Sequence, residues 1–267
     1  MSESSYITPR LTPRERLAYD ARILQVLSRS EFKLKYAGSV LGYVWSLAKP
    51  LAYFTVLWVV FGQLFRSTIP HYPLYLLIGI VLNTFLIDAV TATLPSLVSS
   101  AATLRRISFP PFVIPLSTSI AAAMTFLLNC VVVGVFLGIG GVEPHLDWLL
   151  IVPLLLELYV FTLSIALIVS ALYVRFRDVG QIWEVAISLL FFAAPIVYPI
   201  TQLPPWAERI VSLNPLVQVM QDVRTIILGP GSAPIDSRFA PIVIAAALFA
   251  VAVWLFRRES PRFAERA

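Results

Sequence analysis

Residues that bind metals or form disulfides are scarce in this chain. Its single cysteine, Cys130, has no partner for an intrachain disulfide, and no C-x-x-C pair exists. The two histidines, His71 and His145, lie far apart in the sequence, so zinc, haem and iron–sulfur sites lack a ligand set. These shortages argue against redox and metal chemistry.

Lysine is also scarce, and this bears on nucleotide binding. The phosphate-binding loop of an ATPase needs glycines and a lysine directly before Ser or Thr. Lys33, Lys35 and Lys49 are followed by Leu, Tyr and Pro. No H-E-x-x-H, no G-x-S-x-G and no pair of carboxylates on one face of an apolar run is present either. We therefore expect no catalytic residue, metal or cofactor in this chain, and any nucleotide on another polypeptide.

Charge is rare as well, at 13% of 267 residues against 58% hydrophobic ones, with a mean hydropathy of +0.83. A soluble domain of this size does not tolerate such a balance, so the sequence predicts an integral membrane protein. The excess of 20 Lys and Arg over 15 Asp and Glu also occurs in nucleic-acid-binding proteins. No basic run here alternates with base-stacking aromatics, so we attribute the excess to membrane topology.

Six apolar runs are long enough to cross a hydrocarbon core, which takes about 20 helical residues. They are continuously apolar, whereas barrel strands alternate in polarity. The predicted fold is all-α, within a single transmembrane domain over 1–267, and its spans cover 41–65, 74–97, 112–140, 149–174, 182–200 and 239–256.

The basic residues predict the orientation of these spans. With six spans, only Arg66, Arg209, Arg224 and Arg238 fall on one side, and the other sixteen of the 20 Lys and Arg fall on the side of both termini. The positive-inside rule then places both termini in the cytoplasm. The first forty residues hold no apolar signal-peptide core, so we expect the first span to direct insertion.

Two segments outside the spans have helical patterns. Thr12-Pro13-Arg14-Glu15 is typical of a capped helix start, and it precedes an amphipathic helix over 12–36 at the cytoplasmic face. The alternative is a positively charged anchor that only fixes topology. In the outer segment 201–238, two short amphipathic helices are separated by Asn214-Pro215, and we expect them to re-enter the membrane from outside.

Ionisable residues inside apolar runs suggest function by default. Asp88 and Glu157 lie deep in predicted spans, where a structural hydrogen bond and a place on a transport path are both open. Lys49 and Glu184 lie near cytoplasmic ends, from which their side chains can reach the interface. Gly134-x-x-x-Gly138 permits close helix approach, either within one subunit or between two.

Aromatic residues are concentrated in the first span, and several recur at helical spacing. Such a face suits the apolar faces of sugars along a passage, and ordinary helix packing is the alternative. The channel-lining candidates are Tyr53, Phe54, Trp58, Phe61 and Phe65, together with Asp88. Two short charged connections, 99–111 and 175–179, are either docking sites for a soluble partner or simple positive-inside charge.

Four motifs in order resemble the permease subunit of type-2 ABC exporters, in the branch that exports O-antigen, teichoic acid, galactan and other lipid-linked polysaccharides. The resemblance covers nearly the whole chain. It rests on Phe32-Lys33-Leu34-Lys35-Tyr36 leading into Ser39-Val40-Leu41-Gly42-Tyr43-Val44-Trp45 and Pro50, on Leu104-Arg105-Arg106-Ile107-Ser108-Phe109-Pro110, on Arg177-Asp178-Val179, and on Asn214-Pro215-Leu216 with Arg224.

The resemblance implies a homodimer in the bacterial inner membrane, bound to two copies of a separate ATPase that carries ATP and Mg. It implies roles for three sets of residues, and we add Trp206 of the outer segment to the third set. Coupling to the ATPase would involve Leu104, Arg105, Arg106, Phe109, Arg175, Arg177 and Asp178, the substrate would enter near Lys33, Lys35 and Tyr36, and the outer gate would include Trp206, Asn214, Pro215 and Arg224.

Two other functions stay open at this point. A related type-2 ABC permease could move drugs or lipids, and only the aromatic first span favours glycan over these. An integral-membrane enzyme acting on polyprenyl-linked sugars would need clustered carboxylates or histidines near an interface, and the sequence shows none.

Overall fold

The computed structural model describes residues 12–39, 41–64, 69–100, 110–229 and 239–266, and for 13 and 261–266 only the backbone. These residues form helices and turns, as the all-α prediction requires. The helices are α1 (Pro13–Tyr36), α2 (Val44–Leu57), the π-helix η1 (Trp58–Leu64), α3 (Tyr72–Thr93), α4 (Ser96–Ser99), α6 (Val113–Ile139), the 3-10 helix η2 (Leu146–Leu150), α7 (Ile151–Arg175), α8 (Val179–Ala193), the 3-10 helix η3 (Ile200–Gln202), α9 (Pro205–Val211), α10 (Pro215–Leu228) and α11 (Phe239–Arg266).

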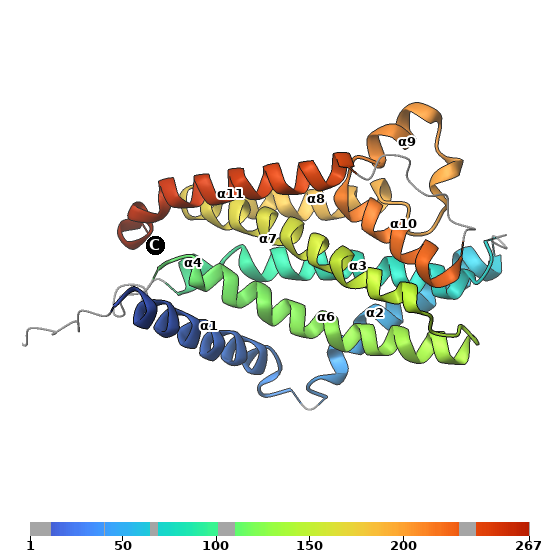
Figure 1. The fold of residues 1–267 in the computed structure, drawn as a ribbon, viewed down its shortest axis with the longest axis horizontal. Coiled ribbons are helices and arrows are strands. Elements are labelled where there is room, and N and C mark those ends of the chain that lie inside the picture. The colour runs from blue at the N-terminus through green and yellow to red at the C-terminus, as the bar shows by residue number, and fades with distance from the viewer. Residues whose placement is uncertain (1–11, 40, 65–68, 101–109, 230–238, 267) are drawn as a thin grey trace, which may run out of the picture.

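The long helices run side by side along the long axis of the molecule, with α3 inside the bundle (Figure 1). Of the most apolar 18 residues of the segment from Tyr72 to Ser99, 78% are buried, because α3 contacts α2, α6, α7 and α10. A helix that is apolar on all sides is expected at such a central position. The corresponding window of α2 and η1 is only 11% buried, so most residues of this span are exposed or partly buried.

Helix α1 confirms the predicted capped helix. The Thr12 hydroxyl accepts a hydrogen bond from the Glu15 backbone N–H, and the Glu15 carboxylate accepts one from the Thr12 backbone N–H. The helix packs along α6, at the flank of the bundle (Figure 1). Its apolar stripe is buried only in part: Leu24 and Leu27 pack against the bundle, whereas Leu17 is 71% exposed.

Five of the six predicted spans are helices long and apolar enough to cross a membrane. They are Val44–Leu64, Tyr72–Ser99, Val113–Ile139, Leu146–Arg175 and Phe239–Ser260. These ends differ from the predicted ones by a few residues, as is usual for helix ends.

The remaining predicted span, 182–200, is wrong in its length, so the count of six is not confirmed. Its helix α8 has 15 residues and ends at Ala193. At 1.5 Å per residue it is about 22 Å long, which is less than a hydrocarbon core of about 30 Å. Pro195 is the physical reason, because proline cannot donate the next helical hydrogen bond and forces the preceding residue out of the helical region. Ala194 is accordingly extended, with ψ of 135°.

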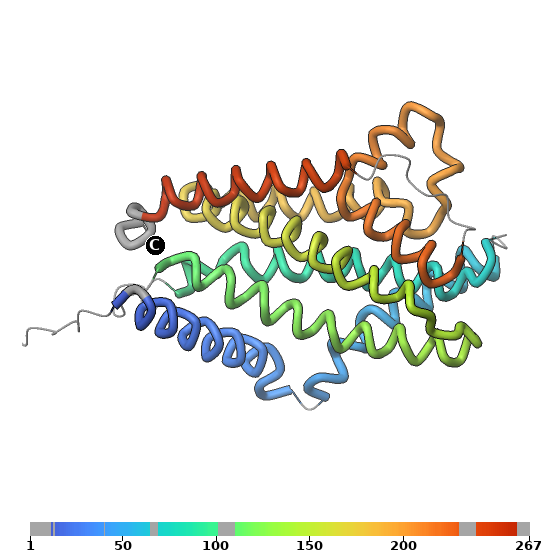
Figure 2. The backbone as a smooth tube through the Cα atoms, in the orientation of Figure 1, coloured from blue at the N-terminus to red at the C-terminus, as the bar shows by residue number. Residues whose placement is uncertain are grey.

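The outer segment contains the two predicted helices, separated at Asn214-Pro215. The Asn214 side chain accepts a hydrogen bond from the Leu216 backbone N–H at 3.0 Å and so caps α10, whose first residue is Pro215. The chain rises from α8 into α9 and turns back into α10 (Figure 2). Helix α9 is exposed, whereas α10 is buried almost all round between α3 and α7.

Helix α11 finishes at the same end of the bundle at which α1 begins (Figure 1). The sequence predicts this relation, with both ends of the chain on one side of the bundle.

Candidate functional site

A groove of about 980 Å³ opens on the free side of α2, where α3 and α8 form its other walls. Its lining combines aromatic rings, polar side chains and one ion pair. The residues are Trp45, Ala48, Lys49, Pro50, Ala52, Tyr53, Val56, Asn83, Thr84, Ile87, Asp88, Ile187, Ser188, Phe191 and Phe192.

The ion pair in this groove joins α2 to α3. Lys49 Nζ lies 3.2 Å from Asp88 Oδ1, with Lys49 71% exposed and Asp88 27% exposed. A carboxylate within an apolar span is costly unless it is paired. The structure therefore gives Asp88 a partner, and it also places Asp88 on the groove wall. Its role in a channel stays a prediction.

The aromatic rings of the groove come from α2 and α8. The Tyr53 and Phe191 rings meet edge to face, with centroids 5.5 Å apart, and Phe191 contacts Phe192 in the same manner at 5.3 Å. Tyr53 is 47% exposed and Phe192 is 75% exposed. Both rings therefore offer free aromatic surface to a molecule in the groove.

The described part of the aromatic face of the first span packs within the bundle, which is one of the two interpretations that its sequence allows. Phe54 is buried, contacts Phe136 of α6 and stacks on Trp58, and Trp58 and Phe61 pack partly against the same core. This is the packing alternative, because that face of α2 turns towards α3 and α6. Phe65 lies outside the described residues. Tyr53 lines the groove because it is one residue away from Phe54, on the outward side of the helix.

Arg224, predicted at the outer gate, is fully buried, and it holds the turn that follows α8. Its guanidinium donates to the Tyr75 carbonyl at 3.0 Å, to the Pro195 carbonyl at 2.8 Å and to the Ile196 carbonyl at 3.0 Å. It also lies 3.4 Å from the centroid of the Tyr75 ring, so part of the cost of burying the charge is offset by a cation–π contact.

Sequence reasoning missed the α3 side of this arrangement. Tyr75 and Tyr72 donate their hydroxyls to the carbonyls of Tyr198 and Val197, both at 3.1 Å. Gly79 leaves room for the Arg224 guanidinium, which a Cβ at this position would strike. The only sequence signal is that the two tyrosines and the glycine recur at spacings of three and four residues, on one face of α3.

We name this arrangement the carbonyl clamp: the side chains of Tyr72, Tyr75 and Arg224 bound to the backbone of residues 195–198. Non-helical backbone at membrane depth is tolerated only where it is buried in protein with its polar groups satisfied. The clamp satisfies four consecutive carbonyls directly after α8 ends. Of the other outer-gate candidates, Trp206 on α9 is 69% exposed, and Asn214 and Pro215 form the start of α10.

The residues expected where substrate enters lie at the end of α1. Tyr36 is buried, its hydroxyl is 3.1 Å from Thr125 Oγ1 of α6, and its ring contacts those of Phe32 and Tyr43. Lys35 reaches the same Thr125 hydroxyl at 3.5 Å, while Lys33 is exposed. The structure thus gives Tyr36 an anchoring role, because it fixes the end of α1 to the middle of α6.

The coupling candidates fall into two groups. Leu104, Arg105, Arg106 and Phe109 lie outside the described residues. The second group occupies the exposed turn between α7 and α8. There, Arg175 lies 5.0 Å from the Phe176 ring centroid and Arg177 lies 5.0 Å from that of Tyr173, and Asp178 immediately precedes α8.

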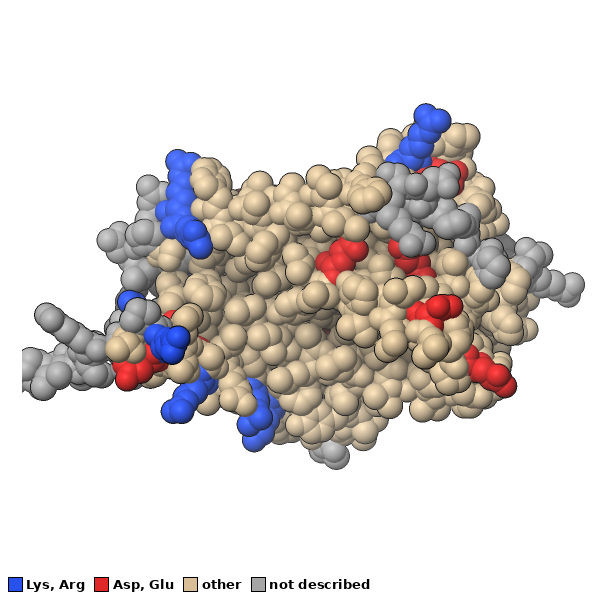
Figure 3. Space-filling model, viewed as in Figure 1, with Lys and Arg blue, Asp and Glu red and all other residues tan. Residues whose placement is uncertain are grey.

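Basic side chains gather at the end of the molecule that holds the start of α1 and the finish of α11 (Figure 3). The flanks between the two ends are mainly uncharged on this face, with a few acidic side chains towards the end near α9 and α10. This pattern agrees with a protein whose flanks face lipid, because charges are costly in the hydrocarbon region.

Residues 22–228 match the family model for ABC-2 type transporters. The chain belongs to this family. The ABC-2 match starts within α1 and finishes at the end of α10, so it includes the groove and the carbonyl clamp. Membership makes the chain a transporter component, and its fold supplies five helices long and apolar enough to cross a membrane among the described residues.

Several ABC-2 proteins resemble the chain over most of its length. An O-antigen export system permease protein of Klebsiella pneumoniae is 31% identical over 213 residues, 79% of this chain and 82% of that protein. A Myxococcus xanthus protein of the same description is 26% identical, over 94% of this chain and 97% of its own length. The polysialic acid transport protein of Escherichia coli is 24% identical, over 78% and 81%.

Proposed function

We propose that this chain is the permease subunit of an ATP-driven exporter that moves lipid-linked polysaccharide across the bacterial inner membrane. The groove between α2, α3 and α8 is the observation that carries this proposal. Tyr53, Phe191 and Phe192 offer aromatic faces to sugar rings, and the exposed Ser188 offers a hydrogen bond to a hydroxyl group. The O-antigen export and polysialic acid transport for which the related proteins are named support the same substrate class.

The groove opens to the outside of a single subunit, so a closed passage needs a second wall. A second copy of the chain supplies it most simply, because a two-fold dimer brings the same face of both subunits together. Helices α2 and η1 suit such an interface, since Trp45, Tyr53 and Val56 of α2 and Val59 of η1 are exposed. A passage of this kind holds a long polymer by repeated weak contacts and needs no site for one particular sugar.

The energy comes from ATP and Mg on two copies of a separate ATPase. This ATPase docks at the basic end of the bundle, which we place in the cytoplasm together with both termini. The turn with Arg175, Arg177 and Asp178 is exposed at that end and is suited to contact a soluble partner.

Export in cells tests the substrate class. In a strain deleted for this chain, the wild type restores surface polysaccharide, Tyr53→Ala lowers its export rate several-fold, and Leu149→Ala leaves it unchanged. An aromatic contact is worth about 0.5–1.5 kcal/mol, and repeated contacts along a polymer accumulate. Leu149 is the matched control because it is 70% exposed and lies away from the groove.

Surface polysaccharide that is unchanged when the chain is depleted would contradict the proposal, as would a purified complex without a stoichiometric ATPase. Transport of a drug or free lipid in proteoliposomes, with no loss of surface glycan on depletion, would favour the related ABC-2 function instead.

A further inference from the structure

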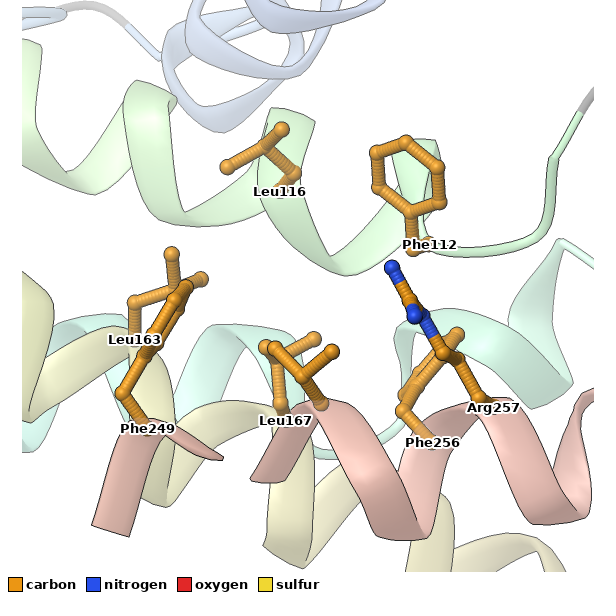
Figure 4. A pocket seen from close by; sticks show the side chains of 8 residues that line it. Phe112, Leu116, Leu163, Leu167, Phe249, Phe256 and Arg257 are labelled. Atoms are coloured by element: carbon orange, nitrogen blue, oxygen red, sulfur yellow. The ribbon is translucent and has the colours of Figure 1, made fainter. Parts of the chain in front are cut away.

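An apolar slot of about 360 Å³ lies between α6, α7 and α11, away from the groove and the carbonyl clamp. Figure 4 shows its side chains, which come from the start of α6, from α7 and from α11. The lining residues are Phe112, Leu116, Leu163, Leu167, Phe249, Val253, Phe256 and Arg257. Seven of the eight side chains are hydrocarbon, so the slot suits an apolar occupant.

The slot is polarised from one end to the other. The Arg257 guanidinium lies beside Phe112 at one end, and Leu163 and Phe249 lie at the opposite end (Figure 4). Phe249 and Arg257 are eight positions apart on α11, which is about 12 Å along the helix axis. A ligand that follows this direction meets a cation first and hydrocarbon afterwards.

Arg257 has no carboxylate within ion-pair distance among the described residues. Its side chain is exposed, so its charge is available to an anion from outside the chain. Next to it, Arg258 lies 5.4 Å from the centroid of the Trp254 ring. Tryptophan and arginine together at the end of an apolar helix are typical of the level of lipid headgroups.

We propose that this slot binds one phospholipid with an anionic headgroup. Its phosphate pairs with Arg257, and one acyl chain extends past Val253 and Leu167 towards Phe249. The position and the charge of the slot both favour a lipid. The slot lies on helices long enough to span a membrane. Its single charge, Arg257, lies towards the finish of α11, at the end of the bundle where α1 begins (Figure 1). Basic pockets between transmembrane helices on the cytoplasmic side are suited to anionic headgroups.

The bound lipid supports the packing of α1. Leu163, Leu167 and Phe256 belong to the apolar cluster against which Ile23 and Leu27 of α1 pack. An acyl chain in the slot fills the other side of that cluster and so stabilises the position of α1.

Native mass spectrometry of the full-length chain tests the proposal, with phosphatidylglycerol and phosphatidylcholine titrated in parallel. We expect the wild type to prefer phosphatidylglycerol. Arg257→Gln weakens phosphatidylglycerol binding about fivefold, the effect of one basic residue at a lipid surface. The matched variant Arg258→Gln changes it less than twofold, because Arg258 does not line the slot. Val253→Trp, which fills the slot, abolishes this binding while Arg257 is still present.

Equal affinity of the wild type for the two lipids would overturn the proposal. So would wild-type affinity for phosphatidylglycerol in Arg257→Gln or in a folded Val253→Trp protein. Arg257→Gln keeps the experiment decisive if Val253→Trp fails to fold, because it changes only an exposed polar head.

Discussion

At the scale of single residues, the buried Arg224 shows how a charge stabilises a break in a helix bundle. All three of its hydrogen bonds go to backbone carbonyls, and its charge lies over the Tyr75 ring. The residues after Ala193 have no helical partners for their carbonyls, and an unsatisfied buried carbonyl costs about 1–3 kcal/mol. Arg224 and the two tyrosines remove that cost for residues 195–198.

Gly79→Ala tests this account, because helix propensity and the clamp predict opposite signs. Alanine in a helix interior is normally more stable than glycine by about 0.5–1 kcal/mol. At position 79 the new methyl group strikes the Arg224 guanidinium, so we expect a lower melting temperature of the purified protein. Gly134→Ala is the matched control, since its Cβ meets open space, and it should be neutral or stabilising. A higher melting temperature for Gly79→Ala would show that the clamp tolerates displacement.

At the scale of elements, local sequence patterns predicted some helix boundaries and missed others. The capped start of α1 and the Asn214-Pro215 boundary depend on local chemistry, and both predictions are confirmed. The end of α8 also has a local cause, Pro195, which the prediction of an unbroken apolar span neglected. Which faces of α2 and α10 are buried depends on their neighbours, so amphipathicity alone did not predict it.

Thr12→Ala tests the capping box at the start of α1. Loss of an N-cap costs about 0.5–2 kcal/mol of helix stability, so we expect faster hydrogen exchange in the first turn of α1. Thr12→Ser keeps the hydroxyl and should exchange like the wild type. Exchange in the first turn of Thr12→Ala that matches the wild type would show that packing on α6 holds the helix without its cap.

The capping box also predicts a pH dependence. The Thr12 backbone N–H, followed by its hydroxyl, donates to Glu15 and lowers the pKa of this carboxyl. The hydrogen bonds between Thr12 and the Glu15 carboxylate therefore stabilise α1 fully above the unfolded pKa of about 4.3. This stabilisation is lost as the pH falls through the lower pKa of the folded state. Over that acidic range, hydrogen exchange in the first turn of α1 should become faster in the wild type relative to that in Glu15→Gln, because a glutamine side chain does not titrate.

At the scale of the whole molecule, the groove explains why so much of α2 is left free. Most of the bundle surrounds α3, and α2 lies at its edge with one wall of the groove exposed. A dimer closed about this face would turn two grooves into one passage. A Cβ added at Gly134 or Gly138 of α6 would meet no described atom within 4 Å. This open space is compatible with the intersubunit contact that the sequence allows for these glycines.

Cysteine crosslinking in membranes tests the dimer. In a Cys130→Ala background, Val59→Cys places a thiol on the exposed side of the η1 helix, and a short bifunctional thiol reagent should yield a covalent dimer. Val152→Cys is the matched control, because it is similarly exposed on α7, away from the groove, and should remain monomeric. Equal crosslinking at both positions would indicate random collision, and no crosslinking at Val59→Cys would contradict this interface.

The sequence by itself determined the membrane class, the helical fold, the capped α1, the two-part outer segment and the family resemblance. All of these follow from composition, periodicity and short motifs, which act locally along the chain. Only the tertiary structure decided that Phe54 packs inward while Tyr53 lines a groove, that Asp88 pairs with Lys49, and that Arg224 binds the carbonyls after α8. The physical reason is that each of these contacts joins residues tens of positions apart, so helix packing determines which side chains meet.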